Sequence, residues 1–129
     1  MAIGAEDTPW SRFAVRLLLV DDSPLVRRMV RLRVGADATV SVLEAASVRE
    51  AGAALGEGCD VALLDLELED GTGVDAARLV LCALPDCRIA FFSTAHEGAL
   101  ADEARVLGPV FEKPHGLAGA VAWLRGGQE

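Results

Sequence analysis

The chain has 129 residues, of which 52% are hydrophobic and 25% are charged, a composition that is ordinary for one soluble globular domain. Its net charge of -8 at pH 7 argues against direct binding to nucleic acid. No apolar run approaches the roughly 20 residues that cross a membrane, and no secretory signal is visible. The three cysteines, Cys59, Cys82 and Cys87, show no disulfide-framework spacing, so we expect reduced thiols and a cytoplasmic location.

The sequence predicts one folded domain with a short tail at each end. Residues 1–14 are polar and interrupted by Gly and Pro, which predicts an N-terminal tail. We expect the domain to cover residues 15–126 and a C-terminal tail to cover residues 127–129. No repeat, linker or low-complexity stretch divides the domain.

Short apolar runs alternate with amphipathic segments along the chain. The apolar runs predict strands at residues 16–20, 39–45, 61–64, 89–92 and 110–111. The first helix is predicted from residue 24 to about 35, with Ser23 as its N-cap and Pro24 at its first position. The second begins with a capping box of Ser47 and Glu50 and ends near Gly56. Further helices are predicted at residues 74–83, 97–106 and 117–125, with a turn at residues 70–73.

Five strands that alternate with five helices indicate an α/β fold with a parallel sheet covered on both faces. The carboxyl ends of parallel strands meet at one edge of such a sheet, where open α/β sheets bind their ligands. Asp21 and Asp22 follow the first predicted strand, Asp65 follows the third, and Lys113 comes just after the fifth. Carboxylates about 4 Å apart repel each other by roughly 4 kcal/mol at an effective dielectric constant near 20. A fold that gathers them therefore implies a cation or a reaction that uses them.

These side chains suit the handling of a phosphoryl group together with a divalent cation. Mg²⁺ prefers oxygen ligands, which Asp21 and Asp22 supply directly or through water. Asp65 is either a ligand or a nucleophile, because carboxylates form covalent acyl phosphates. Lys113 is a compact positive charge that neutralises a phosphoryl oxygen. A hydroxyl group at the end of the fourth predicted strand is a further donor to the same group.

Four motifs occur in order and at suitable spacing: LLVDDS at residues 18–23, LLDLELEDGTG at 63–73, FST at 92–94 and EKP at 112–114. Together they make the chain resemble a two-component response-regulator receiver domain over roughly residues 16–124. The resemblance implies a flavodoxin-like (βα)5 three-layer sandwich whose parallel five-stranded sheet has the order 2-1-3-4-5. It also implies a phosphoacceptor that catalyses its own phosphotransfer and dephosphorylation, and not an enzyme with a separate substrate.

The same resemblance implies a role for each charged residue of the predicted site. Asp65 accepts a phosphoryl group from the phosphohistidine of a sensor histidine kinase or a histidine phosphotransfer protein. Mg²⁺ is held by Asp22, Asp65 and the backbone carbonyl of Glu67, and Asp21 assists directly or through water. Lys113 contacts the phosphoryl group.

The residues that read the phosphorylated state are less regular. We assign the switch hydroxyl to Ser93 in preference to Thr94, because Ser93 follows the apolar run directly. Thr94 stands where the family usually has a small residue, Glu69 where it usually has proline, and Val110 where it usually has an aromatic residue. Phe111 is one place off and is expected to point to the opposite side of its strand. These departures motivate an alternative hypothesis, a degenerate receiver that acts as a phosphorylation-independent interaction module.

The first predicted helix carries Arg27, Arg28, Arg31 and Arg33, which form either a solvated basic face or a docking surface for the kinase or phosphotransfer protein. No effector segment follows residue 129, so we expect an unknown partner protein to carry the output unless the sequence is a fragment. We expect no direct contact with nucleic acid or membrane, and a monomer or weak dimer. An aspartate-nucleophile phosphatase is a weaker alternative, because such enzymes usually carry a larger cap.

Overall fold

The computed structural model describes residues 15–35 and 39–126, so the predicted tails at residues 1–14 and 127–129 lie outside the described residues. A parallel sheet in the order β2-β1-β3-β6-β7 forms the middle of the molecule. Its strands are β1 (Val15–Val20), β2 (Val40–Ala45), β3 (Val61–Leu64), β6 (Arg88–Ser93) and β7 (Val110–Glu112). Counted along the chain, these five strands have the predicted order 2-1-3-4-5, which confirms the flavodoxin-like α/β fold.

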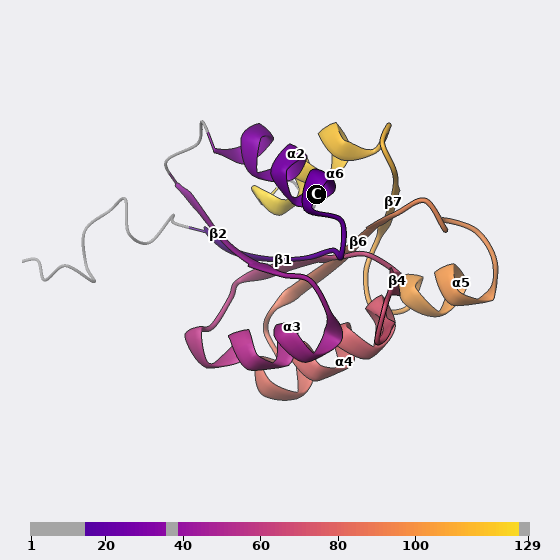
Figure 1. Cartoon of the computed structure of the whole chain (residues 1–129), viewed down its shortest axis with the longest axis horizontal. Helices are drawn as coiled ribbons and strands as arrows, with labels where there is room; N and C mark the ends of the chain where they lie inside the picture. The colour runs from indigo at the N-terminus through magenta and orange to yellow at the C-terminus, as the bar shows by residue number, and fades with distance from the viewer. Residues whose placement is uncertain (1–14, 36–38, 127–129) are drawn as a thin grey trace, which may run out of the picture.

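Helices cover both faces of the sheet (Figure 1). They are α2 (Pro24–Val34), α3 (Val48–Ala54), α4 (Gly73–Ala83), α5 (Ala99–Arg105) and α6 (Leu117–Leu124), with a short 3-10 helix, η2 (Leu55–Glu57), after α3. Helices α2 and α6 lie on one face, and α3, α4 and α5 lie on the other. This is the predicted three-layer sandwich. No helix within the described ranges is long and apolar enough to cross a bilayer.

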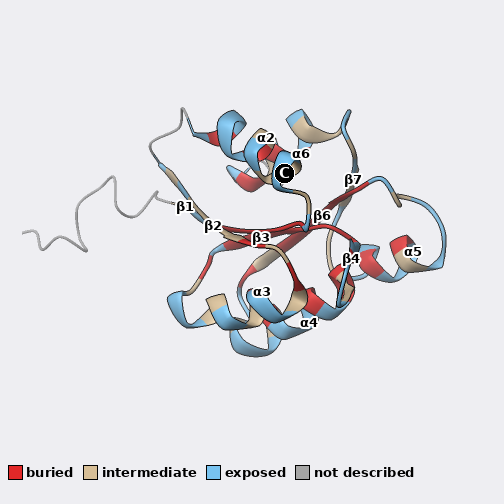
Figure 2. Ribbon diagram, viewed as in Figure 1, coloured by how far each residue is buried: buried red, intermediate tan, exposed pale blue. Residues whose placement is uncertain are grey.

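The sheet separates two apolar clusters, because successive side chains of a strand point to opposite faces. In β1, Leu18 and Val20 pack in the cluster beneath α3, α4 and α5. Leu17 and Leu19 pack in the cluster beneath α2 and α6. The central strands are buried along most of their length, as Figure 2 shows. The buried strands therefore fix the backbone positions of the residues that directly follow them.

Side chains cap the first two helices of the domain near the predicted positions. The Ser23 hydroxyl oxygen accepts a hydrogen bond from the amide of Val26 at 3.2 Å. The Ser47 hydroxyl oxygen accepts one from the amide of Glu50 at 3.0 Å. The Glu50 carboxylate, however, accepts from the amide of Ala46 at 2.8 Å, so the predicted capping box is only half formed.

The segment after β3 is more regular than the predicted turn. Strands β4 (Glu67–Leu68) and β5 (Gly71–Thr72) pair antiparallel, so the predicted turn at residues 70–73 has the wrong bounds. Thr72 then caps α4: its hydroxyl oxygen accepts from the amide of Asp75 at 3.1 Å, and the Asp75 carboxylate accepts from the amide of Thr72 at 3.0 Å. This full capping box begins the helix at Gly73.

Helix α5 is shorter than predicted, because it covers Ala99–Arg105 in place of residues 97–106. Gly98 precedes it with a φ of 102°, a left-handed conformation that favours glycine. No side chain among the described residues caps the start of this helix. The first residues of the predicted helix therefore belong to the loop that follows β6.

Candidate functional site

The carboxyl ends of neighbouring strands bring the predicted site residues together. Beyond β1 and β3, the amide of Asp65 donates to the carbonyl oxygen of Val20 at 2.9 Å. Beyond β6 and β7, the amide of Lys113 donates to the carbonyl oxygen of Ser93 at 3.1 Å. The strand pairing thus continues into the site, and the backbone fixes where each functional side chain begins.

Asp21, Asp22 and Asp65 form an acidic cluster at this edge. One carboxylate oxygen of each residue lies within 4.8 Å of the others. Asp21 and Asp65 are buried, whereas Asp22 is exposed. Three hard oxygen donors, one of them open to solvent, fit a partly hydrated divalent cation such as Mg²⁺.

Two of these carboxylates share one ammonium group. Lys113 Nζ lies 2.7 Å from Asp21 Oδ2 and 3.1 Å from Asp65 Oδ2, and the lysine side chain is 11% exposed. Lys113 is the only lysine in the sequence. Burial alone would lower the pKa of Lys113, but its hydrogen bond to Asp21 and the charge of Asp65 raise that pKa above its ordinary value. The ammonium is therefore charged at neutral pH.

Burial dominates the titration of Asp21. It raises the pKa of the Asp21 carboxyl, and the hydrogen bonds from Lys113 and from the amide of Ser23 offset this effect only in part. The residue is nevertheless held firmly: Oδ1 accepts from the amide of Ser23 at 2.9 Å, and its carbonyl oxygen accepts from Arg27 Nη1 at 2.6 Å. The position of Asp21 is therefore fixed, and any further positive charge in the site would stabilise its ionised form.

Backbone contacts hold the loop that follows Asp65. The amide of Glu67 donates to Asp65 Oδ1 at 3.4 Å, so the Glu67 peptide lies next to the carboxylate while its side chain is exposed. The amide of Gly73 donates to the carbonyl oxygen of Leu66 at 2.9 Å. A Cβ atom on Gly73 would lie 2.2 Å from the carbonyl oxygen of Asp65, so only glycine fits there. The sequence pattern did not indicate this role, because a glycine-rich motif is typical of a turn.

The two candidate hydroxyl groups lie in different surroundings. Ser93 is fully buried, and its hydroxyl oxygen accepts from the amide of Ala95 at 3.1 Å, whereas Thr94 is exposed. In the loop that follows, His96 Nε2 lies 3.3 Å from a carboxylate oxygen of Glu112. This contact joins the loop after β6 to the end of β7, and no motif of the sequence indicated it.

Strand β7 directs Val110 and Phe111 to opposite faces of the sheet, which confirms the predicted alternation. Val110 packs against the cluster beneath α3, α4 and α5, and Phe111 packs against the cluster beneath α2 and α6. Among the described residues of β7, none with an aromatic side chain lies on the α5 face. The Lys113–Pro114 peptide bond that follows this strand is cis.

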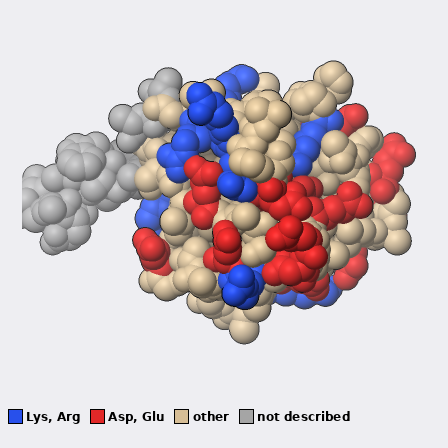
Figure 3. All heavy atoms as spheres, viewed as in Figure 1, with Lys and Arg blue, Asp and Glu red and all other residues tan. Residues whose placement is uncertain are grey.

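Two of the four arginines of helix α2 form ion pairs with β2, although Arg31 itself is exposed. Arg27 Nε lies 3.0 Å from a carboxylate oxygen of Glu44 on β2, and Arg31 pairs with the other oxygen. The hydrogen bond from Arg31 lowers the pKa of Glu44 most, against the effect of burial. Arg28 and Arg33 are exposed. The basic side chains that gather over α2 in Figure 3 therefore serve partly as a contact between α2 and β2.

Comparison with known proteins identifies related sequences. A family model described as the response regulator receiver domain matches residues 17–111. The chain is 43% identical over 76 residues to the DNA-binding transcriptional activator DevR/DosR of Mycobacterium tuberculosis, an alignment that covers 57% of this chain and 35% of that protein. It is 38% identical over 88 residues to a protein-glutamate methylesterase/protein-glutamine glutaminase of Pseudomonas putida, covering 67% of this chain and 24% of that protein. The alignments thus span about a quarter to a third of these relatives.

A solved structure of a response regulator has the same fold as this chain. The two-component response regulator of the LuxR family from Aurantimonas sp. SI85-9A1 superposes with a TM-score of 0.74 and 30% identity, covering 88% of this chain and 86% of that one. The family match begins inside β1 and ends inside β7, so it includes part or all of each of the five strands and the three aspartates of the acidic cluster. The chain belongs to the response regulator receiver domain family and is a receiver domain of two-component signalling.

Proposed function

We propose that this receiver domain accepts a phosphoryl group on Asp65 in a Mg²⁺-dependent reaction, with the phosphohistidine of a sensor histidine kinase or a phosphotransfer protein as donor. The carrying observation is that Asp65 Oδ2 lies 3.1 Å from Lys113 Nζ within a cluster of three carboxylates. A carboxylate oxygen of Asp65 attacks phosphorus, the bond from phosphorus to the donor imidazole breaks, and the nitrogen keeps the electron pair. The product is an acyl phosphate.

The proposed Mg²⁺ ligands are Asp22, Asp65 and the backbone carbonyl of Glu67, with Asp21 assisting directly or through water. Bound there, the cation would offset the repulsion between the carboxylates and the incoming phosphoryl group. The exposure of Asp22 supports this assignment, because a hydrated ion reaches that carboxylate from solvent. The hydrogen bond from Glu67 to Asp65 supports it too, since it holds the Glu67 peptide beside the cluster.

Lys113 and Ser93 are the proposed contacts of the transferred group. Lys113 already touches Asp65, so its ammonium neutralises a phosphoryl oxygen without a large movement. The burial of Ser93 and the exposure of Thr94 support Ser93 as the switch hydroxyl. Rotation of Ser93 toward the phosphoryl group would break its hydrogen bond with the amide of Ala95 and release the loop before α5.

We further propose that the phosphodonor docks on the exposed face of α2. Leu25, Arg28 and Leu32 lie three or four residues apart, which places them on one side of the helix. The two leucines are 75% and 66% exposed, unlike most large apolar side chains of the domain. This surface, rather than the Glu44-bound arginines, fits a partner helix with an apolar stripe and an acidic residue.

We place docking and phosphotransfer in the cytoplasm and assign the output to a separate segment or partner.

A second candidate function is a phosphorylation-independent interaction module. It is favoured mainly by the position of Val110 on the α5 face of β7, where an aromatic side chain would report on the switch. An exposed Glu69 in the loop after Asp65 points the same way. In this case the acidic cluster would persist without carrying out transfer.

The experiment that separates the two is phosphorylation by a small phosphoramidate donor. We expect the full chain to gain one phosphoryl group by intact mass with Mg²⁺, and none with a metal chelator. Asp65→Asn should gain none, and Asp86→Asn, an exposed acid at the opposite edge of the sheet, should behave like the wild type. A folded wild type that gains no phosphoryl group with Mg²⁺ would support the interaction module.

A further inference from the structure

Two cysteines that are distant in the sequence meet at the amino edge of the sheet. Cys59 lies just before β3 and Cys87 lies just before β6, its neighbour in the sheet. Their Sγ atoms are 3.5 Å apart. Both residues are buried, at 8% and 7% exposure, whereas the third cysteine, Cys82, is exposed. The pair lies at the opposite end of the strands from Asp65, so the phosphoacceptor site does not use it.

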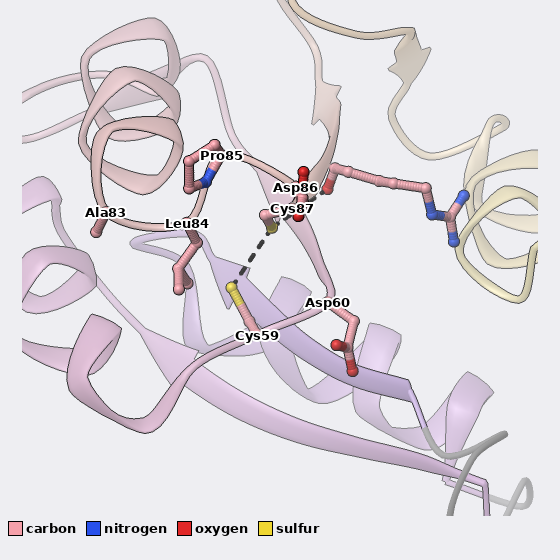
Figure 4. Close-up of a pocket in the computed structure, with 8 residues that line it drawn as sticks. Cys59, Asp60, Ala83, Leu84, Pro85, Asp86 and Cys87 are labelled. Carbon is pink, nitrogen blue, oxygen red and sulfur yellow. Dashed lines mark hydrogen bonds between the residues drawn. The ribbon is translucent and has the colours of Figure 1, made fainter.

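The pair is reached through a cavity. A hollow of about 370 Å³ is lined by both cysteines and by Asp60, Leu84, Pro85 and Arg88. Figure 4 shows the two sulfur atoms directed toward each other, with Leu84 and Asp60 on either side. The small residual exposure of each cysteine and the cavity beside it give a small solute a route to the sulfur atoms.

The two thiols are not equivalent. The hydrogen bond with Cys87 lowers the pKa of the Cys59 thiol against the effects of burial and of the negative charge of Asp60, and the charge of Arg16 lowers it slightly further. The hydrogen bond to Cys59 and burial both raise the pKa of Cys87. The Cys87 thiol also lies 3.6 Å from the carbonyl oxygen of Arg88, an acceptor for its proton. Either sulfur could be the donor in the contact between the two thiols. The lowered pKa of Cys59 favours this residue as the attacking thiolate, and Cys87 then acts as the resolving thiol.

We propose that Cys59 and Cys87 are an oxidisable dithiol that a hydroperoxide converts to an intramolecular disulfide between the starts of β3 and β6. The Cys59 thiolate attacks the terminal peroxide oxygen, the O–O bond breaks, and the released alkoxide or hydroxide takes a proton. The Cys87 sulfur then attacks the sulfenic sulfur of Cys59, the S–O bond breaks, and water leaves with the Cys87 proton. Two thiols and one peroxide give one disulfide, one alcohol or water, and one further water.

Little movement separates the two states. A disulfide bond is about 2.05 Å long, so the sulfur atoms must approach each other by roughly 1.5 Å. Cys59 and Cys87 both lie in loops, just before their strands. The two positions are 28 residues apart, so a bond between them restricts a long loop of the unfolded chain.

The test uses the full chain carrying Cys82→Ser, so that only the paired thiols remain. After hydrogen peroxide treatment and alkylation in denaturant, mass spectrometry should show both thiols lost together and a Cys59–Cys87 cross-linked peptide. The product should be monomeric, should return to the dithiol with dithiothreitol, and should unfold several degrees higher than the reduced protein. Retention of both thiols at peroxide concentrations that oxidise Cys82 in the wild type would overturn the proposal.

Single variants test the assigned order of events. Cys87→Ser should accumulate a sulfenic acid at Cys59 that dimedone labels, whereas Cys59→Ser should leave Cys87 unlabelled. Circular dichroism of each variant reports whether it folds, and the cross-link in the Cys82→Ser chain remains decisive if either variant does not fold. Asp65→Asn should form the disulfide as readily as the wild type, which separates this proposal from the proposed phosphotransfer. Dimedone labelling of Cys87 in place of Cys59 would overturn the assignment of the nucleophile.

Discussion

The ammonium of Lys113 lies 2.7 Å from the carboxylate of Asp21, closer than its 3.1 Å contact with Asp65. One buried positive charge therefore compensates two carboxylates in the unphosphorylated domain. A phosphoryl group on Asp65 would change this balance, because it replaces the carboxylate with a larger group of higher charge. The contact with Asp21 holds the ammonium beside Asp65, where that group would form.

Replacement of Lys113 by methionine tests this shared compensation. We expect Lys113→Met to lose about 3 kcal/mol of folding stability at pH 7, because Asp21 and Asp65 remain buried without a counter-charge. The raised pKa of Asp21 means that its protonation favours the folded state as the pH falls, so the loss should shrink toward about pH 4.5. Urea unfolding at both pH values measures it, with the exposed Arg33→Met as the control.

The ion pairs of Lys113 also predict how the unfolding free energy of the wild type changes at alkaline pH. The pKa of Lys113 is raised in the folded state, so its contribution is complete below its ordinary value of 10.5 and is lost as the pH rises through the folded value. If Lys113→Met loses the same unfolding free energy at acid and at neutral pH, Lys113 does not compensate the buried carboxylates as proposed.

Asp22 should control the response to Mg²⁺ without controlling the fold. We expect Mg²⁺ to raise the thermal unfolding midpoint of the wild type, since a ligand that binds only the folded state stabilises it. Asp22→Asn should abolish this rise and leave the metal-free stability within about 0.5 kcal/mol, because the side chain is exposed. Calorimetry with Mg²⁺ and with a chelator measures both effects. Asp86→Asn should respond like the wild type, and an undiminished response of Asp22→Asn would exclude this residue as a ligand.

Gly73 should be irreplaceable where Gly52 is not. A Cβ atom on Gly73 would lie 2.2 Å from the Asp65 carbonyl oxygen, whereas one on Gly52 would make an ordinary 3.7 Å contact with Leu79. We expect Gly73→Ala to cost about 2–4 kcal/mol and to slow phosphorylation, because the backbone of Asp65 must shift. Gly52→Ala, within a helix, should gain up to about 1 kcal/mol. Equal unfolding free energies for the two variants would contradict the proposed packing.

The arginines of α2 should separate into structural and docking residues. Arg27→Glu should lose about 1–2 kcal/mol, since it breaks the contacts with Glu44 and the Asp21 carbonyl oxygen. Arg28→Glu should keep wild-type stability and its phosphorylation by a small donor, but should slow transfer from a phosphohistidine protein at least several-fold. Stopped-flow or autoradiographic transfer rates measure this. An unchanged transfer rate in Arg28→Glu would exclude docking on this surface.

The sequence predicted the strands of this site well, for a physical reason. A run of apolar residues that ends at a charge defines both a buried strand and its carboxyl end, so Asp21, Asp65 and Lys113 followed directly. Strand order then required only the resemblance to a known family. The start of α4 was less accessible, because the glycines and threonine of residues 71–73 suit a turn, a short strand and a helix cap equally well.

Two other contacts between distant residues were not predictable from the sequence. The approach of Cys59 to Cys87 depends on β3 and β6 being neighbours and on their register, which no local pattern contains. The pairing of Arg27 with Glu44 likewise depends on how α2 packs beside β2. Such contacts depend on tertiary packing, whereas a pattern of apolar residues reports only on the face that each element buries.

The position of the phosphoryl group in the chain shows whether Asp65 is the phosphoacceptor. Phosphorylated protein is reduced with borohydride, which converts an aspartyl phosphate to homoserine, and the digested peptides are sequenced by mass spectrometry. We expect homoserine at position 65 alone, in a Mg²⁺-dependent yield. Modification at another aspartate, or none in a folded domain that has been treated with donor and Mg²⁺, would contradict it.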